Sequence, residues 1–89
     1  MTFSSHASEE FWELYRSLPA DARRQADKQF ALFQQNPWHP SLRLKPVGQV
    51  WTVRISRAYR AIAFRDGDGF YWFWIGDHDD YEVLLKRVE

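Results

Sequence analysis

The amino-acid sequence predicts an α+β fold: a helical hairpin packed on one face of a small antiparallel β-sheet, with a short C-terminal helix. Two observations predict this class. Apolar residues recur every three or four positions in the first 35 residues, as on one face of a helix, whereas from residue 50 onward they alternate or run continuously, as in strands. Three prolines between these regions indicate a loop. Because the chain has 89 residues, we expect one domain spanning residues 1–89.

Two helices are predicted, over residues 9–17 and 20–35. Ser8 can cap the first helix through its hydroxyl, and acidic residues follow it at the positive end of the helix dipole. Pro19 separates the two helices and suits the first turn of the second, and Asn36-Pro37 ends the second. Their apolar positions are Phe11, Leu14, Tyr15 and Leu18, and then Ala22, Ala26, Phe30 and Phe33.

Three strands are predicted, over residues 50–55, 59–65 and 70–75. The first alternates between apolar and polar side chains, and the sequence Asp66-Gly67-Asp68-Gly69 is a strong signal for a hairpin between the other two. The last strand is apolar at every position, so we expect it to be covered on both faces, at the centre of the sheet.

Two further elements are predicted near the ends of the chain. Residues 2–4 indicate a leading edge strand. Asp77 follows the last long strand and can cap a short helix, because its carboxylate would accept a hydrogen bond from the first helical turn. That helix holds Tyr81, Leu84 and Leu85.

The composition limits the kinds of site that the chain can form. Aromatic residues make up 18% of the chain, which supplies the dense core that so short a domain needs. Without cysteine, neither a disulfide framework nor a thiolate nucleophile or metal ligand is available. No signal-like or long apolar segment is present, so we expect a soluble cytoplasmic protein that does not enter a membrane. A formal net charge of zero excludes the global positive field of a typical nucleic-acid-binding protein.

A local excess of positive charge nevertheless lies between Pro37 and Arg65. This segment has no Asp or Glu, and Ser and Thr occur between its six cationic side chains. Arg and Lys supply most phosphate contacts in nucleic-acid-binding proteins, so the segment favours a groove that binds a polyanion. The alternative is a solvated sheet face that lacks acids. The six residues are Arg43, Lys45, Arg54, Arg57, Arg60 and Arg65.

The register of the first hairpin decides where two of these arginines point. With a two-residue loop, Arg54 faces Ala61, and Arg60 lies on the apolar face with Ile55. With a three-residue loop from Ser56 to Ala58, Arg54 and Arg60 lie opposite each other on one face. The sequence favours the second register, because it avoids burying an unpaired charge among apolar groups. Two adjacent guanidinium groups could then bind one phosphate, although they could also be two simply exposed arginines.

A second group of candidate residues follows the last strand. His78 is of the residue type that exchanges protons near neutral pH, and Tyr81 lies three residues on, on the same side of a helical turn. Beside paired arginines, they would suffice for RNA cleavage by the neighbouring 2′-hydroxyl, which needs a base, an acid and cations but no metal. The alternatives are that Asp77, Asp79 and Asp80 only cap the helix and that Tyr81 packs into the core.

No metal or other cofactor is predicted. Asp66 and Asp68 resemble the start of a calcium loop, but the later oxygen ligands are missing, so a turn is the better interpretation. His78, Asp79 and Asp80 are adjacent, and adjacent side chains cannot all converge on one ion.

Three segments together match a known pattern. They are Leu42–Lys45 before a strand, Val53-Arg54-Ile55 followed by Ala58–Ile62, and Trp74–Tyr81. On these residues the chain resembles the RelE/ParE superfamily of bacterial and archaeal type II toxins, and the resemblance covers most of the chain. It implies an α+β fold with a functional groove opposite the helical hairpin. It also implies a cognate antitoxin encoded beside the toxin.

Members of this superfamily that depend on the ribosome cleave mRNA in the decoding site. By resemblance, Arg60 matches the strand arginine near the scissile phosphate, Arg54 and Lys45 match other basic groove positions, and His78 and Tyr81 lie in the region that supplies acid, base or stacking groups. The resemblance therefore implies an mRNA endonuclease whose partners are the ribosome and mRNA. Its catalytic residues would be Arg60, His78, Tyr81 and Arg54, and Lys45, Arg43 and Arg57 would bind phosphate.

The chain departs from this pattern in two respects. It is neutral where such toxins are commonly strongly basic, and an acidic cluster, Asp77–Asp80, lies beside the proposed site. The ParE-type branch uses the same fold to inhibit DNA gyrase without nuclease chemistry. Two alternatives therefore stay open: a gyrase inhibitor, and an inactive homologue that only forms an antitoxin complex.

Overall fold

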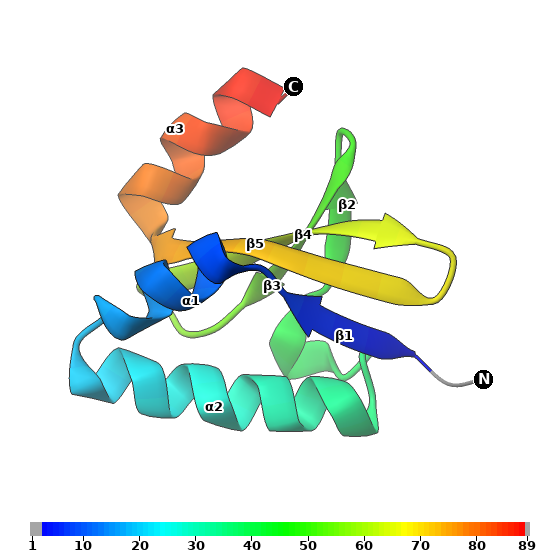
Figure 1. The fold of residues 1–89 in the computed structure, drawn as a ribbon, viewed down its shortest axis with the longest axis horizontal. Coiled ribbons are helices and arrows are strands. Elements are labelled where there is room, and N and C mark those ends of the chain that lie inside the picture. The colour runs from blue at the N-terminus through cyan, green and yellow to red at the C-terminus, as the bar shows by residue number, and fades with distance from the viewer. Residues whose placement is uncertain (1–2, 89) are drawn as a thin grey trace.

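The computed structural model describes residues 3–88, and its helices and strands follow the predicted order with two additions, η1 and β2. The two helices of the hairpin agree with the predicted ranges to within one residue, and the strands predicted over residues 50–55, 59–65 and 70–75 are present. The leading strand shares only Ser4 with its predicted range. Figure 1 shows the arrangement. The elements are β1 (Ser4–Ala7), α1 (Glu9–Arg16), α2 (Ala20–Gln35), the 3-10 helix η1 (Pro40–Leu42), β2 (Lys45–Val47), β3 (Val50–Arg54), β4 (Tyr59–Asp66), β5 (Gly69–Asp77) and α3 (His78–Val88).

The strands described within residues 3–88 form a five-stranded mixed sheet in the order β1-β5-β4-β3-β2. The expected antiparallel pairing holds from β2 to β5, but β1 pairs with β5 in parallel, from Ser4 opposite Gly69 to Ala7 opposite Trp72. The leading strand begins at Ser4, and residue 2 of its predicted range lies outside the described residues. The middle strand is β4, not β5 as predicted, because β2 adds a strand beyond β3.

The sequence did not predict β2, because proline interrupts it. Pro46 lies in the middle of this strand, opposite Trp51 of β3. A proline cannot donate to a ladder of hydrogen bonds, but an edge strand leaves one side of its backbone without a neighbour, so the proline is tolerated there.

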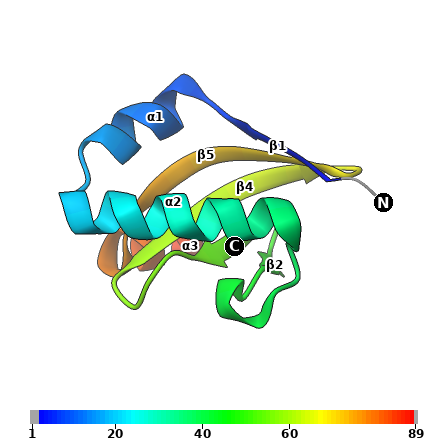
Figure 2. The same cartoon turned by 90° about the horizontal axis from the view of Figure 1, so that it is seen from below.

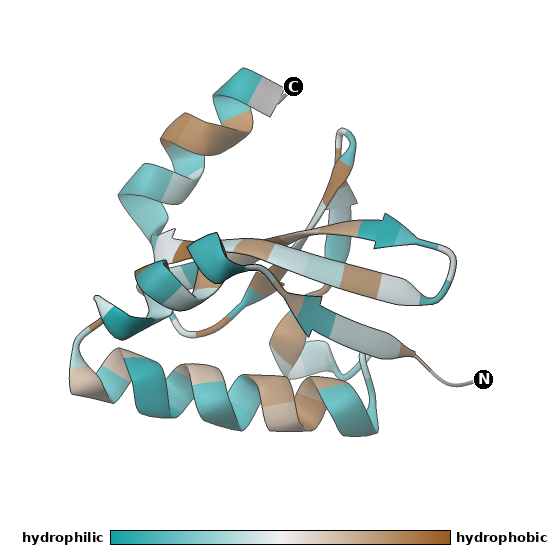
Figure 3. Ribbon diagram, in the orientation of Figure 1, coloured by the Kyte–Doolittle hydropathy of each residue, from teal (hydrophilic) through white to brown (hydrophobic). Residues whose placement is uncertain are grey.

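The helices lie on both faces of the sheet. Helices α1 and α2 cover one face, with α2 lying across the strands, and α3 stands on the other (Figures 1 and 2). Alternation along β4 explains the division: Ala61 and Ala63 pack into the core under the helical hairpin, whereas Ile62 packs on the α3 side. Hydrophobic and hydrophilic positions also alternate along α2 (Figure 3), as expected of a helix with one buried face.

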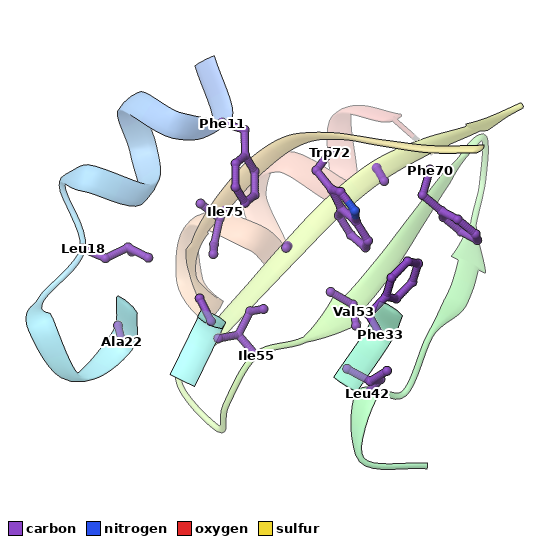
Figure 4. Packing of buried hydrophobic residues seen from close by; sticks show 13 residues of the cluster. Phe11, Leu18, Ala22, Phe33, Leu42, Val53, Ile55, Phe70, Trp72 and Ile75 are labelled. Carbon is purple, nitrogen blue, oxygen red and sulfur yellow. The ribbon is translucent and has the colours of Figure 1, made fainter. Parts of the chain in front are cut away.

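The main core lies between the helical hairpin and the sheet (Figure 4). Aromatic rings fill much of it: Phe33, Phe70 and Trp72 are almost fully buried and meet edge to face or in stacked contacts. Its buried members are Phe11, Leu18, Ala22, Ala26, Phe33, Leu42, Val53, Ile55, Ala61, Ala63, Phe70, Trp72 and Ile75.

A smaller core lies on the α3 side of the sheet. Its buried members are Val50, Ile62, Tyr81 and Leu85. The register between β4 and β5 shifts after Ile62, so that Phe73 has no partner on β4. Because a bulge inserts one extra residue, Phe73 and Trp74 both pack against this smaller core although they are adjacent in sequence.

The predicted caps and turns define where α1, α3 and the last hairpin begin. The hydroxyl of Ser8 accepts a hydrogen bond from the backbone N–H of Phe11 at 3.2 Å, and the carboxylate of Asp77 accepts one from the N–H of Asp80 at 2.9 Å. Gly67 adopts φ +58° in the turn between β4 and β5, a conformation that glycine reaches without a steric penalty. These local signals place the start of α3 at the end of β5.

Candidate functional site

A cleft of about 290 Å³ lies on the α3 side of the sheet, opposite the helical hairpin. Its walls come from the segment leading into β2, from β2, β3 and β4, and from the first two turns of α3. The lining residues are Arg43, Lys45, Val47, Thr52, Arg54, Arg60, His78, Tyr81, Glu82 and Leu85. The cleft therefore collects six of the seven site residues predicted from the sequence, all except Arg57.

The register of the first hairpin brings Arg54 and Arg60 together. They are direct partners in the β3–β4 ladder, and the carbonyl of Tyr59 accepts hydrogen bonds from the N–H groups of Ile55 and Ser56 at 3.1 and 3.2 Å. Three residues therefore form the loop, as predicted. Arg54 and Arg60 share the face with buried Thr52, while Val53 and Ile55 face the main core.

The guanidinium of Arg60 is held at the hairpin turn. Its Nη1 donates hydrogen bonds to the carbonyls of Tyr59, at 2.9 Å, and of Ser56. Partial burial lowers the pKa of Arg60, and the positive charge of Arg54 lowers it further, whereas Tyr81 acts in the opposite direction. Two like charges side by side repel each other, and an anion bound between them would relieve that repulsion.

Gln29, which the sequence analysis missed, supports the position of Arg54. This α2 side chain is buried, and its Nε2 donates hydrogen bonds to the carbonyls of Arg54, at 2.9 Å, and Ser41, at 3.4 Å. It thereby joins the helical hairpin to the end of β3 and to η1. A polar residue on the apolar face of α2 was the one signal in the sequence that could have revealed it.

Arg43 and Lys45 enter the cleft from its open side. Arg43 ends η1 in the left-handed conformation, φ 48°, which non-glycine residues seldom adopt. Buried Leu42 and partly buried Leu44 pack into the main core on either side of it. The chain therefore leaves Arg43 exposed between two buried residues, and Lys45 pairs with Thr52 of β3.

His78 begins α3 at the end of the cleft nearest the hairpin turn. Its backbone N–H donates to the carbonyl of Ala58 at 2.8 Å, so the start of the helix is attached to that turn. Its imidazole is 45% exposed, with Nε2 lying 3.3 Å from Oε1 of Glu82. Glu82 was not predicted as a site residue, although its spacing of four from His78 places the two on one helix face.

Tyr81 packs into the core, as one interpretation of the sequence expected, and also lines the cleft. It is only 6% exposed and belongs to the smaller core, where its ring centroid lies 6.5 Å from that of Trp74. It also lines the cleft, with its ring 5.9 Å from the imidazole of His78.

Two of the six cationic residues in the 37–65 segment do not line the cleft. Arg57 is exposed at the tip of the β3–β4 turn. Arg65 lies on the other face of β4, with its guanidinium carbon 4.9 Å from the ring centroid of Trp51 and 5.2 Å from that of Phe70. The expectation that the whole segment forms one groove is therefore wrong for Arg65, which packs in cation–π contacts because strand alternation points it to the aromatic face.

A second hollow, of about 360 Å³, lies between α1, α2 and β1 and contains none of the predicted site residues. Its walls include the aromatic rings of Phe11, Trp12, Tyr15, Phe30 and Trp72. Tyr15 donates a hydrogen bond to Asp27 at 2.6 Å.

Within residues 3–88, no three His, Asp or Glu side chains cluster as metal ligands, and none of the described helices has the length and apolar character needed to cross a bilayer.

Solved structures with the same fold are bacterial and archaeal toxins. The toxin RelE of E. coli, as a double mutant in the free state, has a TM-score of 0.68 and 18% sequence identity, with 100% of each chain covered. A YoeB/ParE toxin from Agrobacterium tumefaciens has a TM-score of 0.65 and 13% identity, covering 85% of this chain and 99% of its own. The archaeal RelE–RelB complex from Pyrococcus horikoshii OT3 has a TM-score of 0.66 and 14% identity, covering 86% of this chain and 96% of the matched chain.

A search of curated proteins found no match. The model of one protein family, described as the ParE-like toxin domain, matches residues 20–83, from the start of α2 to the second turn of α3. This range includes every residue of the cleft except Leu85. Because this family model matches most of the chain, the protein belongs to the ParE-like toxin domain family.

Proposed function

We propose that the protein is a ribosome-dependent mRNA endonuclease that uses the 2′-hydroxyl of its RNA substrate as the nucleophile. The observation that carries the proposal is the convergence in one cleft of paired Arg54 and Arg60 with His78 and Tyr81. These groups come from two strands and a helix, and the cleft that they line is polar and open to solvent.

The reaction assigns a task to each of these side chains. The 2′-oxygen bonds to phosphorus and the bond from phosphorus to the 5′-oxygen breaks, leaving a 2′,3′-cyclic phosphate and a 5′-hydroxyl. The 2′-hydroxyl loses a proton to a base, and the leaving oxygen gains one from an acid; His78 acts as one of these. Arg54 and Arg60 stabilise the negative charge that the phosphate gains in the transition state. Tyr81 positions the RNA.

The other basic residues hold the RNA backbone. Arg43 and Lys45 stand at the open side of the cleft, where they contact phosphates on either side of the scissile one. Arg57 lies outside the cleft and contributes only to a more distant phosphate.

The neutral net charge favours mRNA held by the ribosome, rather than free RNA, as the substrate. Nucleic-acid affinity rises with the number of phosphates that the protein neutralises, and four cations in one cleft neutralise few. A ribosome that holds the mRNA in place supplies the orientation that the protein's own charge does not. We therefore expect cleavage of translated mRNA and little cleavage of the same RNA without ribosomes.

A second candidate function is inhibition of DNA gyrase without nuclease chemistry. The ParE-like family match favours it, and so does the neutral charge, because binding to a protein does not require a positive field. In that case, the cleft would contact an acidic surface of the enzyme and His78 would have no proton to transfer.

We further propose that a cognate antitoxin binds this toxin in the cytoplasm. One of the structures that share the fold is a complex of RelE with RelB. An antitoxin segment that covered the cationic face or displaced α3 would occlude or dismantle the cleft, since α3 supplies His78 and Tyr81.

The test compares two activities of the purified protein. Reporter mRNA is translated on ribosomes and its new 5′ ends are mapped, and plasmid supercoiling by gyrase is measured in parallel. We expect new 5′ ends only when ribosomes translate, with a loss of about 10²-fold or more for His78→Ala or Arg60→Ala. Arg57→Ala is the comparison variant, because it removes a cation of the same hairpin that lies outside the cleft, and we expect it to lower cleavage far less than either of these changes.

Two other results would each support a different function. Intact mRNA together with blocked supercoiling would establish the gyrase inhibitor. Intact mRNA, normal supercoiling and no growth arrest on expression would indicate a homologue that only forms an antitoxin complex.

A further inference from the structure

We infer that Glu82 is a positioning residue that orients the imidazole of His78 and directs its proton transfer to Nδ1. This inference rests on the proposed RNA cleavage. The contact that carries it joins Oε1 of Glu82 to Nε2 of His78 at 3.3 Å, within the cleft that both side chains line.

The backbone already restricts where this imidazole can lie. The N–H of His78 donates to the carbonyl of Ala58, and Asp77 caps the first turn of α3. Only the side-chain torsions of His78 are then free, and one contact to a ring nitrogen is enough to select an orientation. Glu82 provides that contact from the next turn of the same helix, so the pair moves with α3 as a unit.

Glu82 is also the one carboxylate among the described residues that line the cleft. The other titratable and charged groups that line the cleft are Tyr81 and Glu82 of α3 and four cations, Arg43, Lys45, Arg54 and Arg60. The cations can only donate hydrogen bonds, so Glu82 is the ionised acceptor available to the ring. Asp77, Asp79 and Asp80 are near in sequence but do not line the cleft.

The contact distinguishes the two ring nitrogens. With Nε2 beside the carboxylate of Glu82, the tautomer that carries its proton on Nε2 is favoured, and the neutral imidazole then has its lone pair on Nδ1. The nitrogen whose protonation can change is then Nδ1, and His78 acts as the general base rather than the acid. In hydrolytic triads, a carboxylate holds Nδ1 of the histidine while Nε2 accepts the proton. Here the two nitrogens exchange roles: the carboxylate holds Nε2, and Nδ1 accepts the proton.

In the cleavage step, Nδ1 accepts the proton of the 2′-hydroxyl while the 2′-oxygen forms its bond to phosphorus. The bond from phosphorus to the 5′-oxygen breaks. The 5′-oxygen takes a proton from water. The imidazolium then returns its proton to hydroxide or water, and the cyclic phosphate leaves.

The experiment measures ribosome-dependent cleavage by Glu82→Ala and Glu82→Gln. We expect Glu82→Ala to lower kcat by about 10- to 100-fold with little change in KM, because it removes an outer contact and no RNA ligand. Glu82→Gln retains Oε1 as an acceptor and should keep most of the rate. Asp79→Asn is the matched control, because it neutralises an acid in the first turn of α3 that does not line the cleft.

The double variant separates positioning from other roles. In a His78→Ala background, Glu82→Ala should cause no further loss, because a residue that acts through His78 has nothing left to position. A loss of the same size in both backgrounds would overturn the inference while leaving the proposed nuclease intact.

A measurement without RNA keeps the inference testable if the wild-type protein proves not to cleave. In ¹⁵N spectra of the imidazole, Glu82→Ala should move the Nε2 resonance of His78 more than the Nδ1 resonance, and Asp79→Asn should move neither. Equal shifts from both variants would show that Glu82 does not hold the ring, whatever the activity of the protein.

Discussion

The two faces of the sheet use the same strands for different purposes. Under the helical hairpin, the strands present Val53, Ala61 and Trp72 to a continuous apolar core. On the α3 face, the neighbouring positions present Thr52, Arg54 and Arg60 to a cleft. The first face supplies most of the apolar burial, and the second keeps like charges close together at some expense of stability. Strand alternation thereby separates the apolar core from the charged cleft.

The two hollows repeat this contrast. The one beside α1, α2 and β1 has five aromatic residues in its lining and one charged residue, Asp27, whereas the cleft beside α3 has five charged residues, four of them cationic. Mutations on the two faces should therefore differ in which property they change.

The largest effect is expected from Trp72→Ala on the aromatic face. Trp72 is 2% exposed, and its ring meets those of Phe30, Phe33 and Phe70. Its truncation should lower the free energy of unfolding by about 3–5 kcal/mol, measured by urea denaturation. The neighbouring Tyr71 is 45% exposed, so Tyr71→Ala should cost about 1 kcal/mol or less. Equal losses of stability in Trp72→Ala and Tyr71→Ala would show that the two faces of the sheet do not differ as described.

A smaller loss is expected from Gly76→Ala on the cleft face. A Cβ at Gly76 would lie 2.6 Å from Cζ2 of Trp74, so the indole would have to move away from its position beside Tyr81. We expect about 1–3 kcal/mol of destabilisation and a shifted indole N–H resonance.

Gly69→Ala provides the control for Gly76→Ala. Its added Cβ would also come within 3.0 Å of a ring, at 2.9 Å from Tyr71, but that side chain is half exposed and can swing into solvent. A cost as large as that of Gly76→Ala would contradict the role assigned to Trp74.

A change of opposite sign is expected from Arg54→Gln. Because the charge of Arg54 lowers the pKa of Arg60, removing it should raise that pKa and relieve repulsion in the folded state. We expect a gain in stability of about 0.5 kcal/mol at low salt that shrinks at high salt, together with loss of RNA cleavage. Arg57→Gln, at the exposed turn, should leave stability unchanged and lower RNA cleavage far less than Arg54→Gln does. A loss of stability in Arg54→Gln at low salt would contradict the repulsion between Arg54 and Arg60.

The smallest effect is expected from Tyr15→Phe beside the aromatic hollow. The hydrogen bond to Asp27 and, to a lesser degree, burial raise the pKa of Tyr15 above its ordinary value of 10.0. A raised pKa means that the bond's contribution to stability is complete below pH 10.0 and is lost as pH rises through the folded-state pKa. The stability difference between wild type and Tyr15→Phe should therefore narrow above pH 10.0, as measured by urea denaturation across that range. A constant difference would show that the bond does not form.

Local signals predicted much of this molecule from its sequence. The caps at Ser8 and Asp77 and the turn at Gly67 depend on a few adjacent residues, and each lies where it was predicted. The pairing of Arg54 with Arg60 was also predictable, because the other register would have buried a charge.

Features that depend on distant residues were not predicted. Pro46 concealed β2, which is stabilised by pairing with β3 and not by its own propensity. The sequence analysis grouped Arg65 with the cationic residues of the cleft. Its cation–π contacts could not be foreseen, because they join it to aromatic residues that are far apart in the chain. Glu82 and Gln29 were missed because a single polar side chain carries no pattern until its partner is known.

The parallel pairing of β1 with β5 also bears on the order of folding during synthesis. Residues 4–7 have no strand to join until residues 69–72 have been made, so the first strand waits for one of the last. Contacts so distant in sequence slow the search for the native fold. His78 and Tyr81 follow β5, so the cleft is complete only after α3 has been made. The parallel pairing and the cleft therefore both depend on residues beyond position 68.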